Sequence, residues 1–238
     1  GCSNPEHNTG GIALKFKSVA VDGPSGAGKS TLAKLLAEAL GYLYVDTGAI
    51  YRTVGLAAFR RGIAPTDREK VSAMLPSLKI ALTHGPDGLQ HMFLDGEDVT
   101  GDIRRHEISA YASGVSAIPE VRAFLLERQR ELAQTHNVIM DGRDIGTVVL
   151  PKADVKIFLT ASPEDRARRR YEELVSRGQK TDYNTVFRDL LERDKNDSSR
   201  AAAPLKQAGD AILVDTTGNS LDESFQVLLR TIRERLQA

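Results

Sequence analysis

One short segment near the start of the chain constrains the fold more than any other. Residues 23–31 read GPSGAGKST, which fits the pattern GxxxxGK[ST]. The residues before it, 17–22, are β-branched and apolar, as expected for a strand buried on both faces. The residues after it place leucine and alanine at helical spacing until Gly41, which predicts a helix. A glycine-rich loop in this setting predicts an α/β fold with a parallel sheet and a ligand site at the carboxyl ends of its strands.

The composition of this loop suits a phosphate group. Glycine lets the backbone turn tightly enough for successive N–H groups to point inward, and the start of the helix adds partial positive charge. Lys29 adds a full charge, so we predict that the loop binds the β- and γ-phosphates of ATP. The predicted ATP-binding residues are Gly23, Pro24, Ser25, Gly26, Ala27, Gly28, Lys29, Ser30 and Thr31.

Two oxygen-bearing side chains are predicted to hold magnesium. Ser30 is expected to place its hydroxyl on Mg²⁺, and Asp141 closes the apolar run 138–140 in the manner of a Walker B carboxylate. Mg²⁺ takes few protein ligands and keeps phosphate oxygens and water around it. The predicted cofactor is therefore Mg²⁺ that arrives with ATP.

Further strands and helices alternate along the chain. Short apolar runs at 42–46, 138–141, 154–160 and 211–215 predict four more strands, which gives a five-stranded parallel sheet with covering helices. A helix is predicted over 49–61, and an antiparallel hairpin over 77–95 around the turn sequence HGPDG. Ser162 and Ser220 are the predicted N-caps of two later helices.

Composition and charge exclude several classes of protein. The 238 residues suffice for one domain with insertions, which we predict over 15–238. Lys plus Arg and Asp plus Glu both total 32, so no overall positive field favours nucleic acid or an anionic membrane as a partner. No apolar run approaches the roughly 18 to 20 residues that span a bilayer.

The N-terminal segment and the single cysteine bear on location. Residues 1–14 are polar and glycine-rich, and we predict a disordered tail or a cloning remnant. Cys2 cannot form an intramolecular disulfide, which favours a reducing compartment. We predict a cytoplasmic monomer.

Several segments beyond the phosphate loop carry a distinctive pattern. DTGAIYR at 46–52 follows the second predicted strand directly, and DGEDVTGDIR, DGRDIGTV and ERDKNDSSR stand at 95–104, 141–148 and 192–200. With AAPL at 202–205, they resemble the segments of bacterial cytidylate kinases, a family of nucleoside monophosphate kinases, and the resemblance runs from Val19 to the C-terminus. Thr47 stands where serine is usual in that family, and its hydroxyl is retained.

The resemblance implies a fold and an activity. The fold is a three-layer P-loop kinase with an inserted NMP-binding lobe at about 63–117 and a helical lid at about 163–182. The activity is transfer of the γ-phosphoryl group of MgATP to CMP, and to dCMP, which gives the diphosphate and ADP. Arg166, Arg169 and Arg170 share a helical face by their spacing and are expected to form the lid over ATP. The residues implied to act in catalysis are Lys29, Arg193, Arg200 and Arg170.

The resemblance also implies an acceptor site. Cytosine offers an N4 amino donor and acceptors at N3 and O2, which suits a carboxylate beside donor side chains. The resemblance implies that Ser113, Arg122 and Asp144 contact the cytosine edge. It implies that the other residues of the site contact the phosphate and the ribose. The full predicted CMP-binding set is Thr47, Tyr51, Arg52, Ser113, Arg122, Arg143, Asp144, Arg193, Asp197 and Arg200.

Two alternatives share the phosphate loop. One is a P-loop kinase of another nucleotide or small metabolite, which would differ in the base-contacting residues, and the other is a nucleotide-dependent switch without an acceptor. The stretches DTTG at 215–218 and DKND at 194–197 resemble GTPase motifs. In a GTPase the DxxG motif precedes the NKxD motif, and here the order along the chain is the opposite. We therefore interpret both stretches as coincidences.

Overall fold

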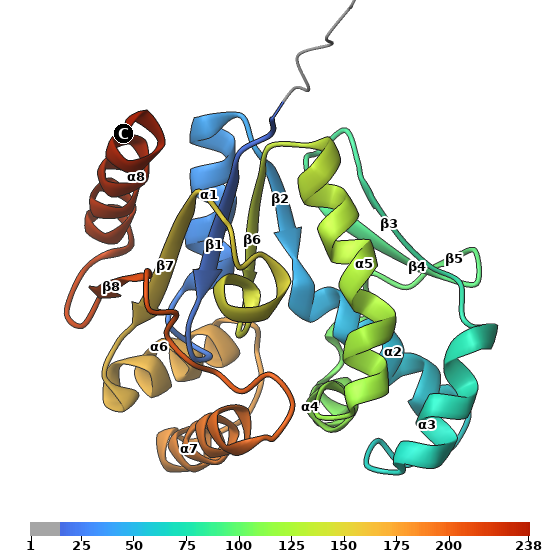
Figure 1. Cartoon of the computed structure of the whole chain (residues 1–238). Helices are drawn as coiled ribbons and strands as arrows, with labels where there is room; N and C mark the ends of the chain where they lie inside the picture. Colours follow the sequence, from blue (N-terminus) through green and yellow to red (C-terminus); the bar gives the residue numbers. More distant parts are fainter. Residues whose placement is uncertain (1–14) are drawn as a thin grey trace, which may run out of the picture.

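Five parallel strands form the central sheet, in the order β2-β6-β1-β7-β8 (Figure 1). The computed structural model describes residues 15–238, so the predicted tail 1–14, with Cys2, lies outside the described residues. The predicted five-stranded α/β sheet is confirmed, and every strand boundary falls within one residue of its predicted position. The strands are β1 Ser18–Asp22, β2 Leu43–Asp46, β6 Val138–Gly142, β7 Val155–Thr160 and β8 Ile212–Asp215.

Apolar side chains build a separate core on each face of the sheet. Val19 and Val21 of β1 pack with α1 and α8, whereas Ala20 between them packs with α2 and α5. The sheet is therefore the middle of three layers, as predicted for a P-loop kinase. The covering helices are α1 Lys29–Leu40, α2 Thr47–Arg60, α5 Pro119–Thr135 and α8 Leu221–Gln237.

Capping side chains set where the helices begin. Ser162 Oγ accepts from Asp165 N and Ser220 Oγ accepts from Glu223 N, each at 3.2 Å, so both predicted caps are confirmed. The helix predicted over 49–61 begins at Thr47 instead. Asp46 Oδ1 accepts from Ala49 N at 3.1 Å, so the residue that ends β2 also caps α2.

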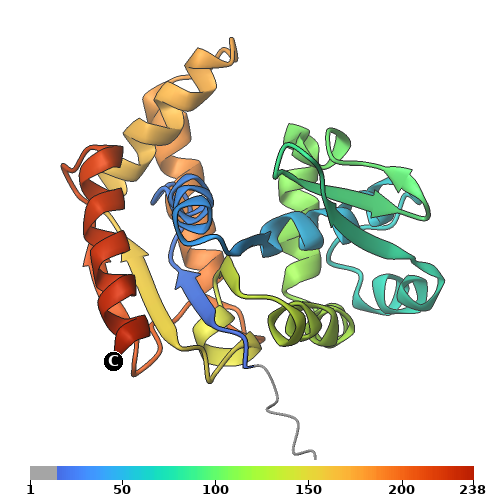
Figure 2. The same cartoon turned by 90° about the horizontal axis from the view of Figure 1, so that it is seen from above.

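A second sheet follows α2 in the chain. The predicted hairpin is confirmed as β3 Ile80–His84 paired antiparallel with β4 Gln90–Leu94, and β5 Glu97–Asp98 adds a third strand that we did not predict. Figure 2 shows this sheet on the opposite side of the molecule from α8. The surrounding helices are α3 Arg68–Met74 and α4 His106–Ser116. The boundaries 63–117 for an NMP-binding lobe stay a prediction.

Two long polar helices follow β7. They are α6 Pro163–Ser176 and α7 Tyr183–Ser199, and they pack against each other. Figure 2 shows α6 protruding from the body of the molecule, while α7 runs back behind α1. The lid predicted over 163–182 corresponds to α6 and the turn that leads into α7, and its movement stays a prediction. Between residues 15 and 238, no helix combines the length and apolar character required to cross a membrane.

Gly55 lies where α2 crosses α4 at close range. A Cβ at this position would lie 2.9 Å from Ala112 N and 3.1 Å from the carbonyl carbon of Tyr111. We expect Gly55→Ala to lower the free energy of unfolding by about 1–3 kcal/mol, because the backbone of α4 must move away. Gly101→Ala is the matched control, since Gly101 has φ −74° and a Cβ added there would meet nothing within 4 Å among residues 15–238. Urea unfolding of both variants checks this, and equal stabilities would contradict it.

Candidate active site

The phosphate loop leaves β1 at the carboxyl edge of the sheet. Gly23 fits only as glycine, because a Cβ there would overlap the carbonyl oxygen of Leu159 on β7. Lys29 Nζ donates to Pro24 O at 3.2 Å, so the ammonium group curls back over the loop. Burial lowers the pKa of Lys29, and the neighbouring charges of Arg143 and Arg193 lower it further. The loop therefore faces a second cluster of positive charge.

A cleft of about 520 Å³ contains that second cluster. Its walls come from α2, α4, α5, the end of β6 with the two residues after it, and α7 with the residue that follows it. All ten residues predicted to bind the acceptor line it, although they span positions 47 to 200. It is also lined by four residues that we did not predict: Gly48, Ala112, Ser116 and Gly142.

One end of the cleft pairs a carboxylate with a guanidinium. Arg122 Nη2 lies 2.6 Å from Asp144 Oδ2, and the side chains are only 10% and 6% exposed. Arg122 Nη1 also donates to Ser116 O at 2.7 Å, and its guanidinium carbon stands 5.0 Å from the centre of the Tyr51 ring. Within residues 15–238, the buried Arg122 Nε has no hydrogen-bond partner. This end offers acceptors and donors side by side, which is what a base edge requires.

The other end of the cleft is rich in arginine. Arg143 Nε donates to Asp197 Oδ2 at 3.2 Å, and Arg200 Nη1 lies 3.8 Å from Asp197 Oδ1. Burial lowers the pKa of Arg193 to about 10, with a further contribution from the charge of Arg143. Burial also lowers the pKa of Arg52, whose Nη1 donates to Ile103 O and Ser109 Oγ at 3.2 Å. These guanidinium groups stay protonated at neutral pH and create a field that attracts an anion.

The residues predicted to hold magnesium offer suitable oxygen atoms. Asp141 is buried at the end of β6, and its Oδ2 accepts from the Tyr44 hydroxyl at 3.1 Å. Burial raises the pKa of Asp141, and the charge of Asp46 raises it further. Ser30 is exposed in the first turn of α1. Carboxylate and hydroxyl oxygens near a phosphate loop fit a Mg²⁺ ion that is held mainly by phosphate and water.

The three arginines predicted to form a lid face have different surroundings. Arg166 is buried and donates from Nη1 and Nη2 to Asp194 at 3.0 and 2.7 Å, and from Nη1 to Ser25 O at 3.1 Å. Arg166 therefore binds the backbone of the phosphate loop through Ser25, and its part in a lid stays a prediction. Arg170 Nη1 donates to Glu173 Oε2 at 3.3 Å, and Arg170 is not among the residues that line the cleft. Besides burial, its charge nevertheless contributes to the lowered pKa of Arg52 and of Arg193.

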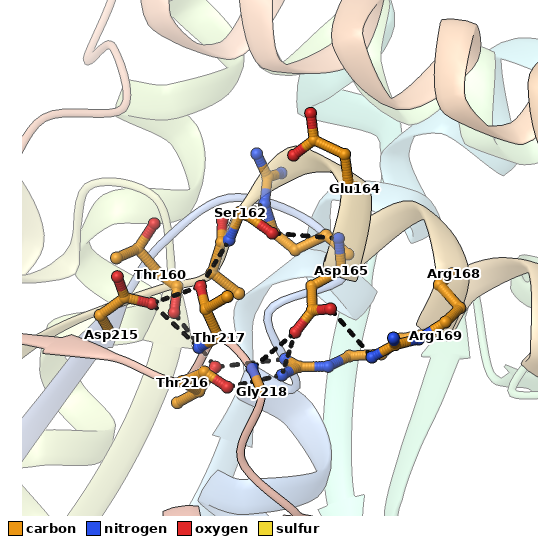
Figure 3. Close-up of polar contacts among 12 residues, drawn as sticks. Thr160, Ser162, Glu164, Asp165, Arg168, Arg169, Asp215, Thr216, Thr217 and Gly218 are labelled. Carbon is orange, nitrogen blue, oxygen red and sulfur yellow. Dashed lines mark hydrogen bonds and ion pairs between the residues drawn. The ribbon is translucent and has the colours of Figure 1, made fainter.

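Arg169 ties the root of α6 to the loop after β8. Figure 3 shows its guanidinium reaching Thr216, where Nη2 donates to the carbonyl oxygen at 2.8 Å. Asp165 Oδ2 accepts from Gly218 N at 2.8 Å in the same network. Asp215 accepts from the backbone and hydroxyl of Thr217, so the DTTG stretch forms a local turn. These contacts explain residues 215–218 without a GTPase role.

Sequence reasoning missed residues that hold the site in place. Gln90 of β4 accepts from Asp46 N at 2.9 Å and donates to Asp46 O at 3.1 Å, which fastens the small sheet to the end of β2. A Cβ on Gly142 would lie 2.7 Å from Thr47 Oγ1, so glycine allows this hydroxyl to approach and donate to Asp141 O. The glycine within DGRD is a usable sequence signal, whereas nothing local marks Gln90.

Comparison with known proteins places this arrangement in a family. The family model described as cytidylate kinase matches residues 19–234. A cytidylate kinase of Caldicellulosiruptor bescii is 52% identical over 216 residues, which cover 91% of this chain and 95% of that protein. One from Leuconostoc mesenteroides is 53% identical over 218 residues, which cover 92% and 97%. The family model and the identity to these relatives along almost the full length of the sequence show that this chain belongs to the cytidylate kinase family.

Proposed function

We propose that this chain transfers the γ-phosphoryl group of MgATP to CMP, and also to dCMP, and releases ADP. The observation that carries the proposal is the single cleft that joins the Arg122–Asp144 pair to the arginine cluster, beside the phosphate loop. A nucleoside monophosphate has a base at one end and a phosphate at the other. The Arg122–Asp144 pair at one end of the cleft suits the base, and the arginine cluster at the other end suits the phosphate. Membership in the cytidylate kinase family supports the same acceptor.

The proposed base contacts distinguish cytosine from uracil. Asp144 accepts from the cytosine N4 amino group, while Arg122 and Ser113 donate to N3 and O2. Uracil has O4 in place of the amino group, so it would set an oxygen acceptor against a carboxylate. Since Asp144 and Arg122 are buried, the mismatched pair has little access to water that could relieve it.

The proposed phosphate contacts reduce charge repulsion. Two unit negative charges 4 Å apart repel by about 4 kcal/mol at an effective dielectric near 20, so two phosphate groups need cations between them. Arg52, Arg143, Arg193 and Arg200 supply guanidinium groups that bridge phosphate oxygens in a planar geometry. The acceptor needs no general base, because a phosphate monoester with a second pKa near 6 is mostly ionised at neutral pH. Positioning and charge neutralisation account for the catalysis.

We assign the phosphate loop residues 23–31 to ATP, with Lys29 placed to neutralise charge on the transferred group. Ser30 and Asp141 would hold the Mg²⁺ of MgATP, and that ion supplies charge neutralisation on the β- and γ-phosphates. Arg170 would approach the transferred group when α6 moves toward the cleft, and the α3–α4 segment would close from the other side to exclude water. We further propose that the enzyme acts as a monomer in the cytoplasm.

A panel of nucleoside monophosphates tests the proposed function. ADP release from ATP is measured by a coupled assay with CMP, dCMP, UMP, AMP and GMP in turn. We expect CMP and dCMP to give the highest kcat/KM, and ATP alone to give almost no release. A higher kcat/KM with another acceptor would favour a kinase of that nucleotide. ATP consumption that does not depend on an added monophosphate would favour a nucleotide-dependent switch.

A further inference from the structure

We propose that Asp22 is a positioning residue that sets the base preference of the acceptor site by holding the backbone beside Asp144. This inference rests on the proposed function and extends it to a residue of the donor-side strand. Asp22 ends β1 and directly precedes Gly23, so it belongs by sequence to the ATP side of the molecule. Its side chain, however, reaches the loop that carries the proposed base-reading carboxylate.

The contacts of Asp22 are short and buried. The residue is 4% exposed, its Oδ1 accepts from Ile145 N at 2.9 Å, and its Oδ2 accepts from Gly146 N at 2.8 Å. Asp22 pairs with Gly142 in the register of β1 with β6. Its carboxylate therefore reaches from the end of β1 to the segment that follows the neighbouring strand β6. Both oxygens are used, and both hold backbone groups.

These contacts fix the backbone of Asp144, which lies between the end of β6 and Ile145. Ile145 N belongs to the peptide group that follows Asp144, and the carbonyl oxygen of that same group accepts from Val148 N at 2.9 Å and Val149 N at 3.1 Å. The peptide is therefore held from both sides, by Asp22 and by the short π-helix Ile145–Val149. The fixed backbone directs the Asp144 side chain onto Arg122, at 2.6 Å. A loosened peptide would let this carboxylate move off the base edge.

Asp22 is also a costly choice for a purely structural role. Burial raises its pKa to about 6, even though its two backbone hydrogen bonds lower the value, and the charge of Asp144 raises it further. The ionised form is thus buried near another carboxylate, and the charge of Lys29 offsets only part of this cost. A side chain retained against such a cost commonly serves a site rather than the stability of the fold.

Asp22→Asn tests the inference. The amide keeps one acceptor oxygen but sets an NH₂ group against the second backbone N–H, which leaves that donor unpaired. We expect the ratio of kcat/KM for CMP to kcat/KM for UMP to fall about tenfold, with KM for ATP changed by no more than about twofold. If Asn does not allow folding, Asp22→Glu, which keeps two acceptor oxygens in a displaced position, is expected to lower the ratio in the same direction. A loss of turnover that is equal for both nucleotides would overturn the inference.

The double variant Asp22→Asn, Asp144→Ala shows whether the effect passes through Asp144. We expect the Asp22 change to leave the CMP to UMP ratio unaltered once Asp144 is absent. A further fall in the ratio in that background would show an independent effect and would overturn the inference.

Asp154→Asn is the matched control, because Asp154 lies just before β7 and its side chain binds the backbone at the start of β1. Its Oδ2 accepts from Ser18 N at 2.9 Å, far along the strand from the cleft, so the wild-type ratio is expected. A comparable fall with this control would assign the effect to β1 in general and overturn the inference. Wild-type protein that shows no preference for CMP would refute the proposed function itself, which keeps that failure separate from a failure of Asp22.

Discussion

Replacing Lys29 by alanine is expected to lower kcat by about three orders of magnitude. The ammonium group lies over the phosphate loop and faces Arg143 and Arg193. In the proposed mechanism it neutralises charge on the phosphoryl group most strongly in the transition state, and the loss of one such group typically costs about 10²–10³-fold or more. Single-turnover measurements with saturating ATP and CMP separate this loss from any change in binding.

The Lys29 variant should remain folded. Burial and like charges lower the pKa of Lys29, so removal of the side chain relieves an unfavourable environment as well as losing a contact with Pro24. Lys34→Ala is the matched control, because Lys34 is an exposed lysine on the same helix. We expect the control to keep the wild-type kcat. A Lys29→Ala enzyme within about tenfold of the wild-type kcat would remove the proposed charge-neutralising role.

Replacing Asp144 is expected to have the largest effect on specificity. Asp144→Ala removes the acceptor for the cytosine amino group and leaves the buried Arg122 without its partner at 2.6 Å. We expect the kcat/KM ratio of CMP to UMP to fall by about 10- to 100-fold, because this ratio reflects one buried hydrogen bond and its mismatch. Asp144→Asn presents an NH₂ donor and is expected to shift the preference further toward UMP.

The measurement that checks this is kcat/KM for both nucleotides at fixed saturating ATP. KM for ATP serves as the internal control and is expected to stay close to the wild-type value, since no residue of the phosphate loop 23–31 lines this cleft. An unchanged CMP to UMP ratio in both variants would exclude Asp144 as the residue that reads the base.

The sequence predicted the parallel sheet well because each of its strands is a continuous apolar run with a clear end. It predicted α7 less well. Within the 17 residues of α7 only Val186, Leu190 and Asp197 are buried, so the apolar periodicity that reveals α1 is nearly absent. The seven-residue α3 is too short for its two buried side chains to form a pattern.

The candidate site was predicted through motifs, and its supporting residues were not. All ten proposed acceptor residues stand in segments with a recognisable pattern or are implied by the family, and they line one cleft. Asp22 and Gln90 act through backbone groups 123 and 44 positions away, respectively. Such contacts depend on how distant segments pack, which composition and spacing do not encode. Arg166 shows the converse, since helical spacing placed it on a face that packing then buried against Asp194.

Asp197 gives the acceptor end of the cleft a property that its arginines alone would lack. This carboxylate accepts from Arg143 Nε and lies beside Arg200, so it balances part of their charge before any substrate arrives. Without such an internal anion the two guanidinium groups would repel each other and swing toward solvent. If these arginines bind the acceptor as proposed, Asp197 holds them in position before the substrate phosphate arrives, so that binding requires less reorganisation of their side chains.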